Sequence, residues 1–153
     1  MTSKKKVLKR EYDRGRAAAM QVQERASAMT GTELYAADDR IPRFKEAVKQ
    51  KNMSDRHAGK ADGYVCKSSA GRVVRLIQNY DSNVWTAEPE ELSAQWGFVW
   101  SDDPRKALPF VAIATSPYNR GNCCTEGGFI YRSKIDGNVH APSAYPAGWE
   151  VAV

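Results

Sequence analysis

The sequence predicts an α+β fold in which N-terminal helices are followed by two small related antiparallel β-modules. Three observations favour this class: helical periodicity in the first 51 residues, short β-rich segments separated by turn residues further on, and an internal repeat among those segments. We expect three parts: a basic helical segment at 1–54, a first β-module at 55–105 and a second at 106–153.

The first predicted helix rests on a stripe of small or weakly polar residues spaced alternately four and three apart within residues 5–30. Its members are Leu8, Tyr12, Gly15, Ala19, Val22, Ala26 and Met29. Such heptad-like spacing is typical of a helix that packs along one seam, and Gly31 stands where a C-cap is expected. The stripe buries little area, so we expect it to need a partner, with a homo-oligomer as one solution. A second helix is expected from about Pro42 to Lys51.

Charge is concentrated in the first third of the chain. The whole chain carries a formal charge of +5, whereas residues 1–51 alone hold 13 Lys and Arg against 7 Asp and Glu. The residues that could contact an anionic partner are Lys4, Lys5, Lys6, Lys9, Arg10, Arg14 and Arg16. Acidic residues interrupt this run and Tyr12 is its sole aromatic residue, so docking to protein is favoured over nucleic acid. A solvated helix face is the plainer alternative.

Beyond residue 54 the sequence consists of short strand-like segments separated by turn residues. Candidate strands are YVCKS (64–68), RVVRLIQ (72–78), GFVWS (97–101), FVAIAT (110–115), GFIYRS (128–133) and WEVAV (149–153). No apolar run is long enough to span a membrane, and the basic N-terminus is not followed by the apolar region of a secretion signal.

Two stretches of this region resemble each other. Residues 71–99 align with 128–153, so that Gly71 meets Gly128, Arg75 meets Arg132, and 81–85 meets 136–140. Pro89 then falls near Pro142, and Trp96 meets Trp149. A short hairpin has little to bury, so Trp96 and Trp149 are expected to be structural core residues.

The second copy also carries short motifs of a known type. The strand FIYRS, the loop with Asn-Val before a proline, and the ending YPAGWEVAV resemble the chitin-binding type modules of carbohydrate-binding module families 5 and 12. The likeness is greatest to versions on bacteriophage structural proteins, where a helical segment precedes the modules. It covers residues 121–153, and 63–100 more loosely.

This resemblance implies a non-enzymatic fold that binds polysaccharide on exposed aromatic rings. The candidate glycan contacts are Trp85, Tyr80, Asp81, Asn83, Gln78, His140 and Tyr145. His140 stands where the alignment expects an aromatic platform, usually Trp, whereas the first copy keeps Trp85. The first copy is therefore the favoured sugar site, and the second is expected to serve scaffolding or subunit contacts.

Other chemistry finds little support in the residues. Cys66, Cys123 and Cys124 lack the spacing of a zinc site or a disulfide framework, and a strand is expected to send one of the adjacent pair inward and the other outward. No orienting group accompanies Cys124 and His140 as a nucleophile and base, and no phosphate-binding loop follows a strand. We predict no catalytic residue, no metal site and no cofactor.

These expectations combine into a bacteriophage virion accessory protein: a fibre, tail or capsid decoration subunit made in the bacterial host cytoplasm. Its partners would be other virion proteins, host polysaccharide and further copies of itself. Two alternatives stay open. One is a purely structural assembly protein without glycan binding, and the other is a basic nucleic-acid-binding or host-regulatory phage protein.

Overall fold

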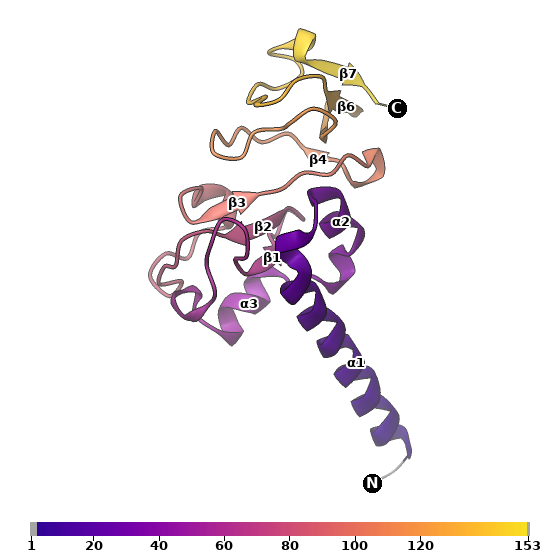
Figure 1. The fold of residues 1–153 in the computed structure, drawn as a ribbon, viewed down its shortest axis with the longest axis vertical. Helices are drawn as coiled ribbons and strands as arrows, with labels where there is room; N and C mark the ends of the chain where they lie inside the picture. The colour runs from indigo at the N-terminus through magenta and orange to yellow at the C-terminus, as the bar shows by residue number, and fades with distance from the viewer. Residues whose placement is uncertain (1–2, 153) are drawn as a thin grey trace.

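The structure is a computed structural model that describes residues 3–152, apart from the side chains of residues 3–9 and 11–13. It has the predicted mixed α+β class, with an N-terminal helix followed by one three-stranded and one four-stranded sheet. The elements follow one another along the long axis of the molecule, from α1 at one end to β7 at the other (Figure 1).

Helix α1 (Ser3–Arg25) projects from the body, and only its last turns are packed (Figure 1). Val22 and Ala26 are buried, whereas Gly15 is exposed. The C-terminal part of the predicted stripe therefore packs against this chain's own first sheet and α2, through Leu34 and Val65 among others. The side chains of Leu8 and Tyr12 lie outside the described residues.

Gly31 begins a helix and does not end one, so the predicted C-cap is wrong. A 3-10 turn, η1 (Ala26–Ala28), ends the first helical stretch, and α2 (Gly31–Ala36) starts after a capping box between Thr30 and Glu33. A Cβ on Gly31 would lie 2.1 Å from the carbonyl oxygen of Trp100. Close packing against Trp100 therefore requires glycine at this position. A second 3-10 turn, η2 (Asp38–Arg40), follows α2.

The second predicted helix is confirmed as α3 (Phe44–Gln50), which lies within the expected range. It buries Phe44 and Ala47 and is followed by the 3-10 turn η3 (Met53–Asp55), which buries Met53. These two short elements cover the first sheet.

The first sheet is an antiparallel meander in the order β1 (Val65–Lys67), β2 (Val73–Leu76) and β3 (Trp96–Phe98). All four residues of β2 are buried, as expected of a central strand covered by helices. The 3-10 turn η4 (Pro89–Glu91) precedes β3, and Trp96 pairs with Leu76. The predicted strands at 64–68 and 72–78 are confirmed, and that at 97–101 is displaced toward Trp96.

The second sheet has the order β4 (Leu108–Pro109), β5 (Cys123–Glu126), β6 (Phe129–Ser133) and β7 (Trp149–Val151). β4 is parallel to β5, and the other pairs are antiparallel. The 3-10 turns η5 (Pro104–Lys106) and η6 (Pro146–Gly148) precede β4 and β7. The predicted strand at 128–133 is confirmed, and that at 149–153 is confirmed for Trp149–Val151, with Val153 outside the described residues.

Two expectations about this sheet were wrong. Residues 110–115 form no strand, because Ile113 enters the core and its carbonyl starts a turn that is closed by Ser116. Cys123 and Cys124 lie in β5, which was not among the candidate strands, and both are buried, whereas one of the pair was expected to face outward. The Cys123 thiol is covered because the backbone carbonyl of Asp102 lies 3.6 Å from it.

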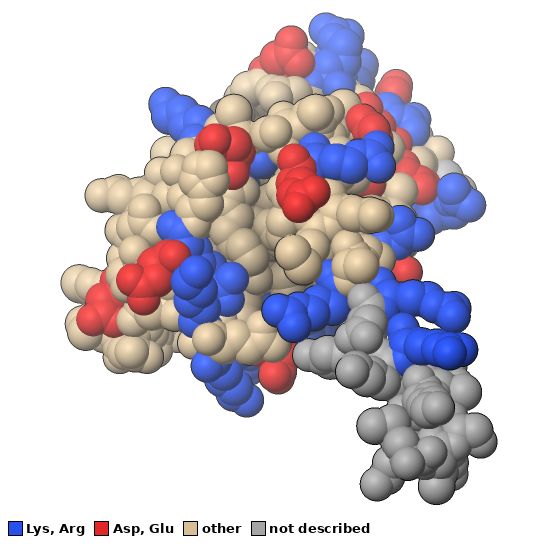
Figure 2. Space-filling view, turned by 60° about the horizontal axis from the view of Figure 1, so that its bottom comes forward, with Lys and Arg blue, Asp and Glu red and all other residues tan. Residues whose placement is uncertain are grey.

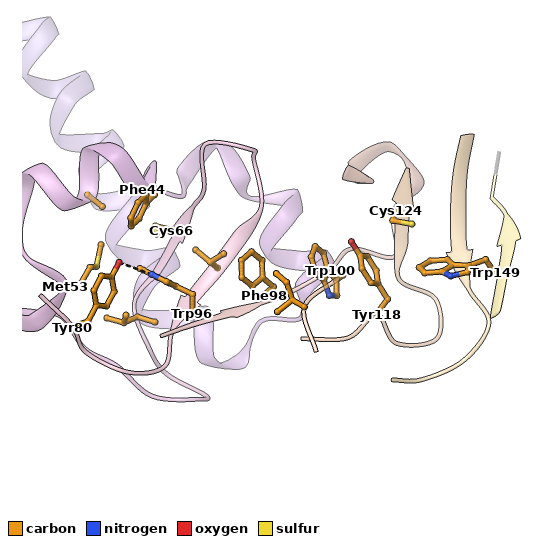
Figure 3. Packing of buried hydrophobic residues seen from close by; sticks show 14 residues of the cluster. Phe44, Met53, Cys66, Tyr80, Trp96, Phe98, Trp100, Tyr118, Cys124 and Trp149 are labelled. Carbon is orange, nitrogen blue, oxygen red and sulfur yellow. Dashed lines mark hydrogen bonds between the residues drawn. The ribbon is translucent and has the colours of Figure 1, made fainter. Parts of the chain in front are cut away.

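A chain of aromatic rings joins the two sheets into one core (Figure 3). Phe44 and Tyr80 pack edge-on against Trp96 in the first sheet, and Phe98 stacks on Trp100. The Trp100 ring stacks on Tyr118 with centroids 4.2 Å apart, and Tyr118 and Phe110 both pack against Trp149. All three predicted segments, 1–54, 55–105 and 106–153, contribute side chains to this cluster. Trp96 and Trp149 are core residues, as predicted.

Candidate functional site: two turns that present aromatic side chains

The most exposed aromatic ring in the described structure belongs to Trp85, which ends a five-residue turn that we call the Trp85 turn (81–85). The carbonyl of Asp81 accepts hydrogen bonds from the backbone N–H groups of Val84 and Trp85, at 3.2 and 3.0 Å. The carboxylate of Asp81 accepts a further one from the N–H of Asn83 at 2.9 Å. Asp is favoured at such a position because its side chain can satisfy backbone donors two residues on.

Asn52, which caps η3, holds this turn to the body. Its amide nitrogen donates to the Asp81 carboxylate at 2.9 Å, and its amide oxygen accepts from the N–H of Ser82 at 3.1 Å. The Ser82 hydroxyl in turn accepts from the N–H of Met53. Hydrogen bonds from Asn52 and then from Asn83 lower the pKa of Asp81 below its ordinary value, since both favour the carboxylate. Asn52, which lies 29 positions before Asp81 in the chain, therefore fixes the turn to the body.

Trp85 and its neighbour Val84 extend outward from this fixed base. Trp85 is 61% exposed and Val84 67% exposed. An aromatic face with an aliphatic neighbour, held on a rigid turn, offers a surface on which the C–H face of a sugar ring or an apolar partner can stack. Of the predicted hydrogen-bonding residues, Gln78 and Asn83 are exposed beside it in sequence.

Tyr80 is not part of this surface, so its predicted role as a stacking residue is wrong. Its ring is only 8% exposed, and its hydroxyl accepts a hydrogen bond from Nε1 of Trp96 at 3.0 Å. Burial raises the pKa of Tyr80. Its amphipathic ring satisfies the one polar atom of the buried Trp96, which is a structural role.

A second turn of the same form lies in the second sheet, and we call it the Tyr145 turn (141–145). The carbonyl of Ala141 accepts from the N–H groups of Ala144 and Tyr145, as Asp81 does from Val84 and Trp85. The N–H of Ser143 donates to the carboxylate of Glu126 at 2.9 Å, which ties the turn to β5. Tyr145 is 41% exposed, and its ring packs edge-on against His140 with centroids 5.8 Å apart.

The indole N–H groups show which residues of the two turns correspond. Nε1 of Trp96 donates to Tyr80, and Nε1 of Trp149 donates to the carbonyl of His140 at 2.8 Å. Tyr80 and His140 each immediately precede their turn. By this geometry Trp85 corresponds to Tyr145, and His140 corresponds to Tyr80.

In this comparison of the two turns the residue equivalent to Trp85 is Tyr145, one of the predicted glycan contacts, whereas the sequence alignment placed His140 there. Pro89 likewise corresponds to Pro146, because each is the first residue of the 3-10 turn before a Trp-led strand. Pro142 instead lies within the Tyr145 turn and is buried. The signal in the sequence was Pro-x-x-Trp at 146–149, with Tyr145 directly before it.

The basic residues of α1 form a separate feature. Arg10, Arg14 and Arg16 are exposed. Lysine and arginine side chains group where α1 leaves the body (Figure 2). The side chains of Lys4, Lys5, Lys6 and Lys9 lie outside the described residues.

The thiols are placed as core residues. Burial raises the pKa of Cys124 to about 12 and also raises that of Cys66 and Cys123. A thiol with a raised pKa is a poor nucleophile at neutral pH. Among the residues that the structure describes, no group of three or more His, Cys, Asp or Glu side chains is placed to hold a metal ion.

Comparison of the chain with protein-family models, with curated proteins and with solved structures finds no match. Within the described part of the chain, none of the helices has the length and apolar character needed to cross a bilayer.

Proposed function

We propose that this protein is a non-enzymatic binding protein of a bacteriophage virion, a fibre, tail or capsid decoration subunit. It would use the Trp85 turn to contact a polysaccharide of the host surface or a neighbouring subunit. The observation that carries the proposal is the rigid presentation of an exposed indole: Trp85 is 61% exposed while its turn is held by Asn52. Exposed aromatic rings on fixed backbone are a common way to bind sugars without catalysis, since little entropy is lost on binding.

We further propose that the two sheets are related modules. Each contains a three-stranded antiparallel meander, β1 to β3 or β5 to β7. In each, a Pro-led 3-10 turn precedes a last strand that begins with a buried Trp. Each loop also carries a turn that ends in an exposed aromatic residue. On this view Tyr145 is a second, weaker contact, and several copies on one particle would bind through avidity.

A polysaccharide pull-down tests the proposal directly, with chitin, cellulose and host cell-wall fractions as solid phases. We expect the wild type to be retained on at least one phase and the Trp85→Ala variant to lose most of that retention. Trp85 is exposed, so its replacement should change the free energy of unfolding by no more than about 0.5 kcal/mol. Met20→Ala is the matched control, because Met20 is also exposed and lies on α1. Equal retention of wild type and Trp85→Ala on every phase would contradict the glycan role.

One observation favours a purely structural virion role as a second candidate: most of α1 extends beyond the body (Figure 1). A helix of 23 residues with a thin apolar stripe is marginal alone and gains stability from a partner. In this role Trp85→Ala would impair incorporation into particles and no polysaccharide would be bound.

Removal of residues 1–16 distinguishes the remaining alternative. If the basic segment grips nucleic acid, retention on DNA falls steeply with salt and disappears in the truncated protein. If the segment docks on protein or self-associates, the truncated protein keeps its sheets, as circular dichroism would show, but changes its mass in sedimentation.

A further inference from the structure

A cavity of about 530 Å³ lies between the start of α3 and the turn that joins β1 to β2. Its volume falls within the range of small-molecule sites in proteins. It is separate from the aromatic turns described above, and its lining residues are Asp38, Arg43, Phe44, Lys45, Lys67, Ser68, Ser69, Gly71 and Leu108.

The cavity wall carries an excess of positive charge. Arg43, Lys45 and Lys67 line it, and among the described residues none of the three forms an ion pair with a carboxylate. The one carboxylate in the wall, Asp38, is already engaged by Lys106 at 3.3 Å. Unpaired cations on one concave wall raise the local concentration of anions.

The nearby carboxylates are also engaged. Glu90 pairs with Arg72 at 3.2 Å and accepts a hydrogen bond from the hydroxyl of Ser68. Glu88 accepts from the backbone N–H of Ser69 at 2.8 Å. Glu90 is thus neutralised by Arg72, whereas Glu88 keeps its charge because its partner is a neutral N–H group. The three cations of the wall still outnumber this one carboxylate that no cation pairs with.

Part of this wall is preorganised. The ammonium group of Lys67 donates to the backbone carbonyl of Asp38 at 3.0 Å, and the N–H of Lys67 donates to the carbonyl of Pro42. β1 is thereby tied to the segment that leads into α3. A fixed cation loses less side-chain freedom on binding than one that moves freely in solvent.

The remainder of the wall suits a ring that carries hydroxyl groups. Half-buried Leu108 supplies apolar surface, and the hydroxyl of Ser69 makes no hydrogen bond within the described structure. We propose that this cavity binds an anionic sugar, a pyranose that bears a carboxylate or a phosphate, as part of a polymer. The cations hold the anion, and the apolar surface contacts the ring.

This assignment extends the proposed glycan role and rests on it, because a short stretch of chain links the Trp85 turn to the cavity wall. Glu88 is three positions after Trp85 in the chain, and it is bonded to Ser69 in the cavity wall. A chain of three residues spans at most about 11 Å. A single polymer could therefore stack one unit on Trp85 and place the anionic group of another in the cavity.

An acidic glycan is favoured over nucleic acid by what the wall contains. Proteins that grip single-stranded nucleic acid combine cations with exposed aromatic rings on which bases stack. The one aromatic residue of this wall is Phe44, which is buried and packs edge-on against Trp96.

The test is a titration of the full chain monitored by amide chemical shifts in NMR. The probes are glucuronate, glucose 6-phosphate, glucose, inorganic phosphate and a single-stranded DNA oligonucleotide. We expect the two charged sugars to shift the amides of 67–71 and 43–45, and glucose to leave them unchanged. Inorganic phosphate should bind more weakly than glucose 6-phosphate, because it lacks the ring.

Matched variants assign the effect to the cavity. Combined Arg43→Gln and Lys45→Gln should weaken binding of the charged sugars about tenfold or more, since each removes a charge-assisted contact. Lys49→Gln is the control, because Lys49 is an exposed cation of α3 outside the cavity. Trp85→Ala should leave these shifts intact, so a failed polysaccharide pull-down and a failed cavity titration are distinguishable.

Three results would overturn the assignment. One is equal shifts with glucose and glucuronate, which would remove the role of charge. Another is equal binding of phosphate and glucose 6-phosphate, which would remove the role of the sugar. The third is DNA binding to the cavity that exceeds that of both charged sugars.

Discussion

The two sheets end in the same way but are covered differently. In the first, α2, α3 and η3 pack around β1 to β3, and every residue of β2 is buried. In the second, part of the sheet stays open: Phe129 and Val151 are 56% and 58% exposed. The Trp85 turn is accordingly anchored by several hydrogen bonds to a covering element, whereas the Tyr145 turn is held by one bond to its own sheet. This difference shows that the helical elements that cover a sheet can also fix the position of a loop, as Asn52 does for the Trp85 turn.

The strongest test of this comparison removes the buried tryptophans one at a time. Replacing Trp96 or Trp149 with Ala should cost about 3–5 kcal/mol each, with Trp96 toward the upper end because it is completely buried under α3. The shared aromatic chain predicts a single unfolding transition for both variants in calorimetry. Two separate transitions in Trp149→Ala would show that the sheets unfold independently and would break the comparison.

Alkaline pH should loosen both regions through different groups. Burial raises the pKa of Tyr35, beside the first sheet, and of Cys124, in the second, each to about 12. Because the folded state keeps these protons more tightly than the unfolded state, stability is retained below the unfolded pKa values. It falls as pH rises toward 12, by at most about 1.4 kcal/mol per pH unit for each group.

Urea titrations between pH 8 and 11.5 measure this loss. The decline should begin near pH 9 through the three buried thiols, of which Cys124 is one, and steepen near pH 10 as Tyr35 and the other buried tyrosines begin to contribute. In Cys124→Ala the early part of the decline should be shallower. An unchanged pH profile in that variant would show that the thiol proton is not held by the folded state.

A smaller effect is expected at the two turn anchors. Asn52→Ala removes bonds to Asp81 and Ser82 and should cost about 1–2 kcal/mol, mainly because the partly buried N–H of Ser82 loses its acceptor. Glu126→Ala removes the one exposed bond to Ser143 and should cost less than about 1 kcal/mol. Thermal unfolding gives both values. Equal costs would contradict the difference in anchoring.

Local patterns in the sequence were sufficient for much of the fold. Helical periodicity predicted α1 and α3, and runs of Val, Ile and Tyr predicted β1, β2 and β6. Three elements were missed for physical reasons. β4 is only two residues long, too short to show a pattern. α2 is six residues long and starts at Gly31, where only glycine fits against Trp100. β5 begins with two cysteines, which carry little strand signal.

The candidate site was predicted in part. Trp85 is exposed as expected, but Tyr80 is buried because Trp96 needs a partner for its indole N–H, which no local pattern reveals. The correspondence of Trp85 with Tyr145 depends on backbone hydrogen bonds in loops of different sequence. The cavity beside α3 was not found, because Arg43, Lys45 and Lys67 come from segments joined only in the folded chain.

The attachment of α1 has a consequence for orientation. The side-chain amide of Gln23 forms hydrogen bonds with both the N–H and the carbonyl of Val65. The helix is therefore hydrogen-bonded to the outer edge of β1, and Val22 packs in the core beside it. A 23-residue helix is about 35 Å long and stiff over that length. A partner bound at its far end would therefore also fix the orientation of the body and the direction in which Trp85 faces.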